Sequence, residues 1–75
     1  MELQKQFAAK IRDARRQAGY TQLTLAMISG LNRSYISDVE REKKCPSLNV
    51  CEDLMRSLNM EIIFRPIRAT TGTSK

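Results

Sequence analysis

The residues whose side chains are best suited to specific polar contacts lie between positions 33 and 41. At about 100° of rotation per residue, five of them share an arc of about 140° on a helix. They are Arg33, Ser34, Ser37, Asp38 and Arg41. An arginine in the first turn can donate two hydrogen bonds to guanine, a serine hydroxyl can bond a base edge or a phosphate, and a carboxylate can accept from cytosine. Since Ile36 and Val39 lie opposite, the spacing predicts a helix with one core face and one face for a DNA major groove.

Catalysis and metal binding lack their usual residues. The chain contains no histidine, which removes the commonest general base, and no two residues have the spacing of a nucleophile and its base. Cys45 and Cys51 could supply two metal ligands, but a zinc site needs about four. We therefore expect two free thiols, no metal, no cofactor and no enzymatic activity.

The charge indicates a polyanionic partner. The chain has 75 residues, enough for one small domain, and 13 Lys and Arg against 8 Asp and Glu give a net charge of +5. Charge alone leaves nucleic acid, an anionic membrane and an acidic protein open. Because no window resembles a membrane span or a signal peptide, we expect no membrane partner and a cytoplasmic, nucleoid-associated location.

Apolar spacing predicts two helices in the first half of the chain. The first is marked by an apolar stripe at intervals of three and four, and Gly19 ends it. The stripe consists of Leu3, Phe7, Ile11, Ala14 and Ala18. Thr21 caps a second helix that runs to about Ser29, with Leu25, Ala26 and Ile28 facing inward and Gly30 in the turn that follows.

Two further helices are predicted between residues 33 and 58. Asn32 caps the helix from Arg33 to about Arg41, and Ser47, after Pro46, caps the last one. The inward face of this last helix is expected to hold Leu48, Cys51, Leu54, Met55 and Leu58.

The segment 60–67 is of a different kind, because it is rich in β-branched and aromatic residues. We expect one strand, which has no partner within the chain and therefore pairs with the same strand of a second copy. The expected dimer interface consists of Met60, Ile62, Ile63, Phe64 and Ile67. Residues 1–59 would form the DNA-binding domain, 60–67 the dimerisation strand and 68–75 a disordered tail.

Several motifs occur in one order and at one spacing. They are Gly19-Tyr20-Thr21-Gln22, Leu25-Ala26, Gly30-Leu31-Asn32-Arg33-Ser34-Tyr35-Ile36-Ser37, Glu40-Arg41 and Pro46-Ser47-Leu48. Over about residues 5 to 58 the chain thereby resembles the phage-repressor and Cro-type (XRE) helix-turn-helix family. The resemblance implies an all-α fold: a compact four-to-five-helix repressor-like DNA-binding domain, here with a C-terminal β-strand that pairs across a dimer.

The resemblance also implies roles for individual residues. Gln22 would contact the phosphate backbone and support the recognition helix, on which Arg33, Ser34, Tyr35 and Asp38 occupy the base-contacting positions with Ser37 and Arg41 beside them. For Tyr35 a packing role and a DNA contact are equally open, and Lys43 and Lys44 could contact phosphates or belong to an ordinary loop. A family ion pair between the first and third helices falls on Arg15 and Glu40.

Two features depart from the family pattern. Glu42 stands where the family usually has glycine, so the end of the recognition helix is open to question. Leu23 and Met27 occupy positions that are usually polar, which indicates either a protein contact or tolerated exposure.

The function implied is a sequence-specific transcriptional regulator. We expect a dimeric repressor or autoregulator on a pseudo-palindromic DNA operator, nearest to antitoxins of the HipB type because of the predicted strand. The alternatives are a controller protein of a restriction-modification system, and a protein-interaction module that neutralises a partner such as a toxin.

Overall fold

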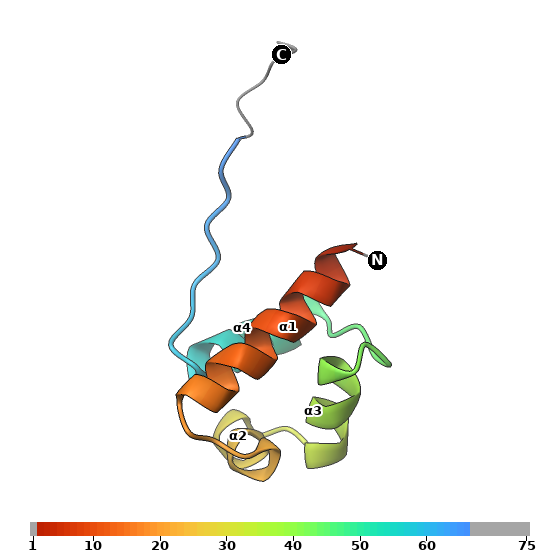
Figure 1. Cartoon of the computed structure of the whole chain (residues 1–75), viewed down its shortest axis with the longest axis vertical. Helices are drawn as coiled ribbons and strands as arrows, with labels where there is room; N and C mark the ends of the chain where they lie inside the picture. Colours follow the sequence, from red (N-terminus) through yellow and green to blue (C-terminus); the bar gives the residue numbers. More distant parts are fainter. Residues whose placement is uncertain (1, 67–75) are drawn as a thin grey trace.

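A computed structural model of the protein describes residues 2–66. In that range the chain contains helices and loops and no strand. The four helices are α1 (Glu2–Gln17), α2 (Gln22–Ser29), α3 (Arg33–Glu40) and α4 (Leu48–Ser57). In Figure 1, α1 crosses in front of α4, while α2 and α3 lie at the lower end of the domain. The all-α prediction is confirmed, with four helices in the described range. None of them is long and apolar enough to cross a membrane.

The helix starts follow from local capping. The side chains of Thr21, Asn32 and Ser47 accept hydrogen bonds from backbone N–H groups at 3.0, 2.8 and 3.3 Å, in the first turns of α2, α3 and α4. Each bond satisfies a donor that the helix itself cannot pair. The three predicted caps are therefore confirmed.

The helix ends share a left-handed cap, formed by Gly19, Gly30, Glu42 and Asn59. At the end of α3, Glu42 has φ 62°, its N–H donates to the Val39 carbonyl at 3.1 Å, and the next N–H reaches the Asp38 carbonyl at 2.7 Å. These two bonds form a Schellman motif. The departure from glycine at position 42 therefore leaves the cap in place, with a residue that adopts this conformation at a cost.

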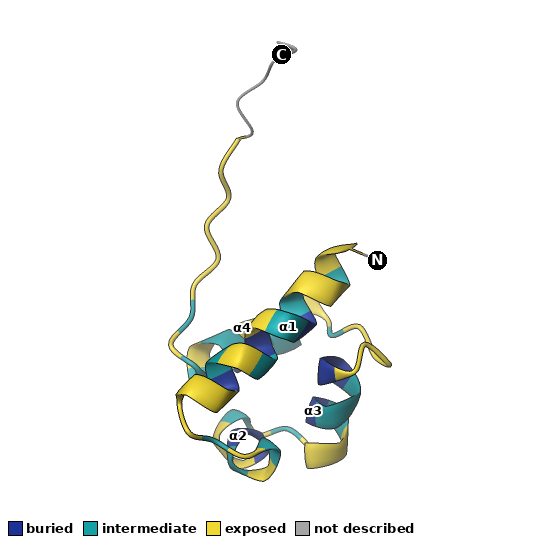
Figure 2. Cartoon of the chain, viewed as in Figure 1, coloured by how far each residue is buried: buried dark blue, intermediate teal, exposed yellow. Residues whose placement is uncertain are grey.

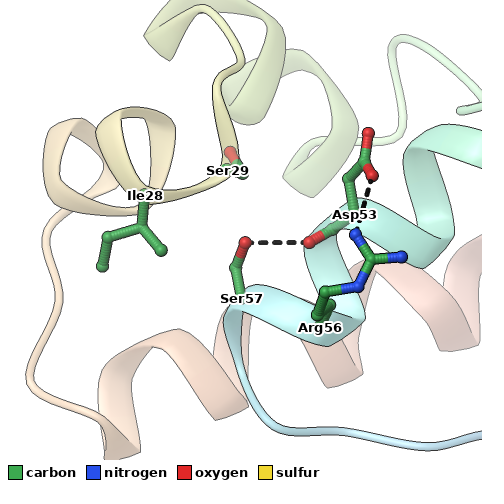
Figure 3. Close-up of a pocket in the computed structure, with 5 residues that line it drawn as sticks. All are labelled: Ile28, Ser29, Asp53, Arg56 and Ser57. Atoms are coloured by element: carbon green, nitrogen blue, oxygen red, sulfur yellow. Dashed lines mark hydrogen bonds and ion pairs between the residues drawn. The ribbon is translucent and has the colours of Figure 1, made fainter.

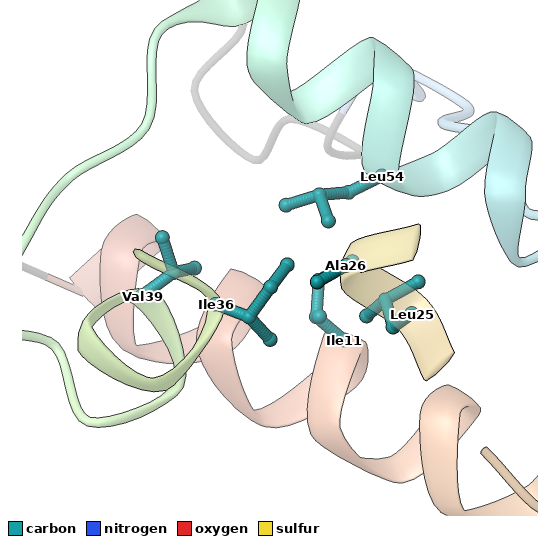
Figure 4. Packing of buried hydrophobic residues seen from close by; sticks show 6 residues of the cluster. All are labelled: Ile11, Leu25, Ala26, Ile36, Val39 and Leu54. Atoms are coloured by element: carbon teal, nitrogen blue, oxygen red, sulfur yellow. The ribbon is translucent and has the colours of Figure 1, made fainter. Parts of the chain in front are cut away.

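The core consists of the buried side chains of Ile11, Leu25, Ala26, Ile36, Val39 and Leu54. Figure 4 shows these side chains converging from all four helices. A cluster of this size is what a 75-residue chain can bury. It fixes the inner face of α3 through Ile36 and Val39, and so leaves the opposite face to solvent.

Four residues that were predicted to face the core are exposed instead. Leu3, Ile28 and Leu48, the large ones, are 72%, 49% and 86% exposed. Ile28 and Leu48 are rotated by about 110–120° from the centres of their buried faces, and Leu3 lies in the first turn of α1, beyond the core. Ala18 is also exposed, while Ala8, which lay outside the predicted stripe, is buried.

The strand that was expected at residues 60–67 is absent from the described part of the C-terminal segment. From Met60 to Pro66 the single chain forms no strand, and this segment runs away from the helices (Figure 1). Met60 packs against the core, whereas Ile62, Ile63 and Phe64 are exposed. Figure 2 draws most of this segment in the colour of exposed residues. A strand requires a neighbouring strand to bond, and the single chain offers none. The predictions for Ile67 and for residues 68–75 lie outside the described residues.

The cap of α3 yields a stability prediction. Glu42→Gly should raise the free energy of unfolding by about 0.5–1 kcal/mol, because glycine removes the left-handed strain but adds entropy to the unfolded chain. Urea unfolding followed by circular dichroism measures the change. Asn59→Gly is the matched control and should gain less, since asparagine tolerates this conformation. A loss of stability in Glu42→Gly would contradict the cap assignment.

Candidate nucleic-acid interface

The polar residues predicted to contact DNA lie on one face of α3. Arg33, Ser34 and Arg41 are exposed, and Ser37 and Asp38 are half-buried. Ile36 and Val39 are buried on the other side, and Glu40 is buried at the edge of the face, next to Arg33 around the helix. The structure thus brings the predicted residues together, although their contacts with DNA stay a prediction.

A buried ion pair sets the rotation of α3. The Nε and Nη2 of Arg15 donate to the two carboxylate oxygens of Glu40 at 2.7 and 3.0 Å. The two side chains are only 11% and 4% exposed. The bonds to Glu40 raise the pKa of Arg15, so the guanidinium stays charged. The pair that the family resemblance implied is therefore confirmed.

The same carboxylate also binds α2. Gln22 donates from Nε2 to Oε1 of Glu40 at 3.2 Å, and Arg15 donates from Nη1 to the Tyr20 carbonyl at 3.0 Å. Glu40 on α3 is thus bonded to α1 and α2 at once. The hydrogen bond from Gln22 to Glu40 agrees with the predicted support of α3 by Gln22. The phosphate contact of Gln22 stays a prediction.

The other side of α3 carries a looser set of contacts. The Asp38 carboxylate lies 3.5 Å from Arg41 and 3.9 Å from Lys44, and the Lys44 ammonium lies 5.5 Å from the centre of the Tyr35 ring. Ion pairs this exposed contribute about 1 kcal/mol or less. Both cations can therefore leave Asp38 for a phosphate at little cost.

Tyr35 and Lys43 complete the predicted set. Tyr35 packs against the core and burial raises the pKa of its hydroxyl, which stays protonated and able to donate. Lys43 is exposed in the loop after α3, and within residues 2–66 it forms no ion pair.

One supporting residue was missed by the sequence analysis. Gln4 donates from Nε2 to the Glu42 carbonyl at 3.2 Å, which ties the first turn of α1 to the loop that carries Lys43 and Lys44. The available signal was its position seven residues before Ile11 of the predicted stripe, which places it within about 20° of that residue on the inner side of α1.

Two hollows lie outside the α3 face. A shallow one of about 250 Å³ between α2 and α4 is lined by Ile28, Ser29, Asp53, Arg56 and Ser57 (Figure 3). Its polar side chains are already hydrogen-bonded within the protein. Arg56 lies 3.3 Å from Asp53, the Ser57 hydroxyl donates to the Asp53 carbonyl at 2.8 Å, and the Ser29 hydroxyl donates to the Leu25 carbonyl at 2.8 Å. These bonds leave little polar chemistry for a ligand.

The second hollow is an apolar groove of about 610 Å³ between α1, α4 and the C-terminal segment. Leu3, Phe7, Leu48, Met55 and Phe64 are among its lining residues. The free thiols of Cys45 and Cys51 also line it, and burial raises the pKa of Cys51. Over the described part of the chain, no three potential metal ligands cluster.

Comparisons with known proteins agree with this geometry. The sequence profile of the helix-turn-helix family matches residues 11–64. The immunity repressor protein of Bacillus phage phi105 is 34% identical over 53 residues, which are 71% of this chain and 37% of that repressor, so the chain spans little more than a third of this relative. The crystal structure of the restriction-modification controller protein C.AhdI from Aeromonas hydrophila matches with a TM-score of 0.76 and 36% identity, over 81% of this chain and 92% of the controller.

The buried pair yields a second prediction. Glu40→Ala should lower the free energy of unfolding by about 3–5 kcal/mol, because it leaves the Arg15 charge buried without a partner. The double variant Arg15→Met/Glu40→Leu should lose far less, since it removes both charges. Urea unfolding compares the two. A loss in Glu40→Ala of about 1 kcal/mol or less, as for an exposed pair, would show that the pair does not hold α3.

Proposed function

Since the chain belongs to the helix-turn-helix family, as its motifs indicate, we propose that it is a transcription regulator that recognises a DNA sequence with α3. The observation that carries this proposal is the polar face of α3, held outward by the bonds of Glu40 to Arg15 and Gln22. The matched relatives are named a repressor and a controller protein, which supports a regulatory role.

Recognition begins at the first turn of α3. Arg33 is exposed there and can place two N–H donors on O6 and N7 of a guanine, the commonest specific contact in the major groove. Ser34 and Ser37 can bond bases or phosphates next to it. Gln22, at the first position of α2, can donate a hydrogen bond to the phosphate backbone that flanks the groove.

Regulation by occupancy of an operator is the biological role that follows. We favour a repressor or autoregulator whose bound form excludes RNA polymerase. The match to a controller protein over 92% of its length favours the controller-type alternative over the antitoxin-like one. A toxin partner is not needed to explain any described contact.

The proposed regulator is a dimer, because the apolar groove and the C-terminal segment leave large side chains exposed. Leu3, Leu48, Ile62, Ile63 and Phe64 are 52–90% exposed. A second copy, docked by two-fold symmetry, would cover these side chains and give residues 60–66 the neighbouring strand that they lack. The symmetric pair would place two α3 helices on successive half-sites of a pseudo-palindrome.

A specificity measurement tests the proposed function. Arg33→Ala should cost about 1–3 kcal/mol at one guanine position of each half-site and little at the others. The matched control Lys43→Ala removes a charge nearby and should weaken all sequences alike. Sequences selected from a random duplex pool by each variant provide the readout. An equal loss over all sequences for Arg33→Ala would refute base recognition by this residue.

The dimer has its own test. Phe64→Asp should give monomers in sedimentation velocity and lower the affinity for a two-half-site operator, because it places a charge in the proposed apolar interface. Leu23→Asp is the matched control, since it changes an exposed leucine on α2, and should remain dimeric. A dimeric Phe64→Asp, or a wild-type protein that is monomeric at every concentration, would contradict the interface.

A further inference from the structure

One flank of α1 carries only positive charge. Lys5, Arg12 and Arg16 are spaced by seven and four residues, so they lie within about 40° of one another around the helix. Each directly follows a residue of the inner side, namely Gln4, Ile11 and Arg15. The three cations therefore form a stripe about 16 Å long, rotated by about 100° from the inner side of α1.

The contacts of α1 show which neighbour this stripe adjoins. α3 and the loop after it lie against Gln4 and Arg15, through Glu42 and Glu40. The apolar groove lies on the opposite flank, against Phe7 and Lys10. Around the axis of α1, the residues therefore follow in the order Phe7, Ile11, Arg15 and then the stripe. The Phe7 side faces α4, the Arg15 side faces α3, and the stripe lies just beyond α3.

The polar face of α3 borders the same solvent-filled side. If Glu40, which points toward α1, is taken as zero, Arg33 and Ser37 lie about 20° and 60° away in the exposed direction. Ile36 and Val39 lie in the opposite direction, toward the core. By these rotations, the α1 stripe and the first residues of α3 face the same side of the domain.

The charges of the α1 stripe have not been neutralised within the protein. Among residues 2–66, Arg15, Arg41, Lys44 and Arg56 form ion pairs, whereas Lys5, Arg12 and Arg16 form none. Lys5 and Arg16 are exposed and Arg12 is half-buried. Asp13 and Glu2 lie further round α1, on its outermost side.

We propose that Lys5, Arg12 and Arg16 bind the phosphate backbone of the duplex that α3 contacts, which extends the interface beyond the helix-turn-helix. The inference rests on the proposed function. DNA fits better than an acidic protein, because the stripe lies on the flank of α1 next to α3, whose exposed Arg33 and Arg41 are also cationic. The backbone also presents a charge about every 3.4 Å along each strand, so several phosphates lie within reach of the stripe.

The test is the salt dependence of binding, measured by fluorescence anisotropy. The probes are the duplex that wild-type protein selects from a random pool and a duplex of random sequence. Arg12→Ala and Arg16→Ala should each lower the slope of log K against log salt concentration by about 0.9. Both probes should weaken by the same factor, since phosphates carry no sequence information. Arg16→Lys should restore the slope.

Arg56→Ala is the control, because it removes one exposed positive charge from α4, outside the proposed DNA interface, and should leave the slope at the wild-type value. Alanine favours the helix, so these variants keep the fold. If Arg12→Ala and Arg16→Ala change the slope no more than Arg56→Ala does, the stripe does not bind phosphates and this inference is overturned. If wild-type protein binds neither probe, the proposed function itself fails.

Discussion

The position of α3 depends on one buried carboxylate. Glu40 receives two hydrogen bonds from Arg15 on α1 and one from Gln22 on α2. A buried charge is tolerated only when its partners are in place, so the arrangement of three helices is linked at this point. Because Glu40 faces inward, helical geometry turns Ser34 and Arg41, about 100–120° away from it, toward solvent. Arg33 lies only about 20° from Glu40 around the helix and is exposed because it is the first residue of α3. The buried ion pair of Glu40 thus determines which face of α3 is exposed to solvent.

The small core explains why the apolar surface outside it matters. Six buried side chains fill the centre of the domain, while Leu48 and Phe64 remain 86% and 90% exposed. In a chain of this size the apolar residues that the monomer cannot cover are available for an interface between copies. Dimerisation would then add stability and set the distance between two recognition helices, which makes the C-terminal segment part of the specificity without a contact to any base.

Local signals in the sequence predicted more than non-local ones. The caps at Thr21, Asn32 and Ser47 were correct because each depends on hydrogen bonds within one turn, and the co-facial set on α3 followed from rotation alone. Burial of Leu48 was wrong, because periodicity identifies an apolar residue but not which flank a neighbouring helix covers. The expected strand needed a partner outside the chain, and the pairing of Asp38 with Lys44 depended on a loop geometry set by Glu42.

The most direct measurement is an NMR titration of the ¹⁵N-labelled protein with the duplex that it selects from a random pool. If α3 enters the major groove, the largest amide shifts should fall on Gln22 and residues 33–44. Smaller shifts should follow along the α1 flank at Arg12 and Arg16, and the α4 residues around Arg56 should stay unchanged. Largest shifts at Leu23, Met27 or residues 60–66, with α3 unaffected, would contradict DNA recognition by this helix.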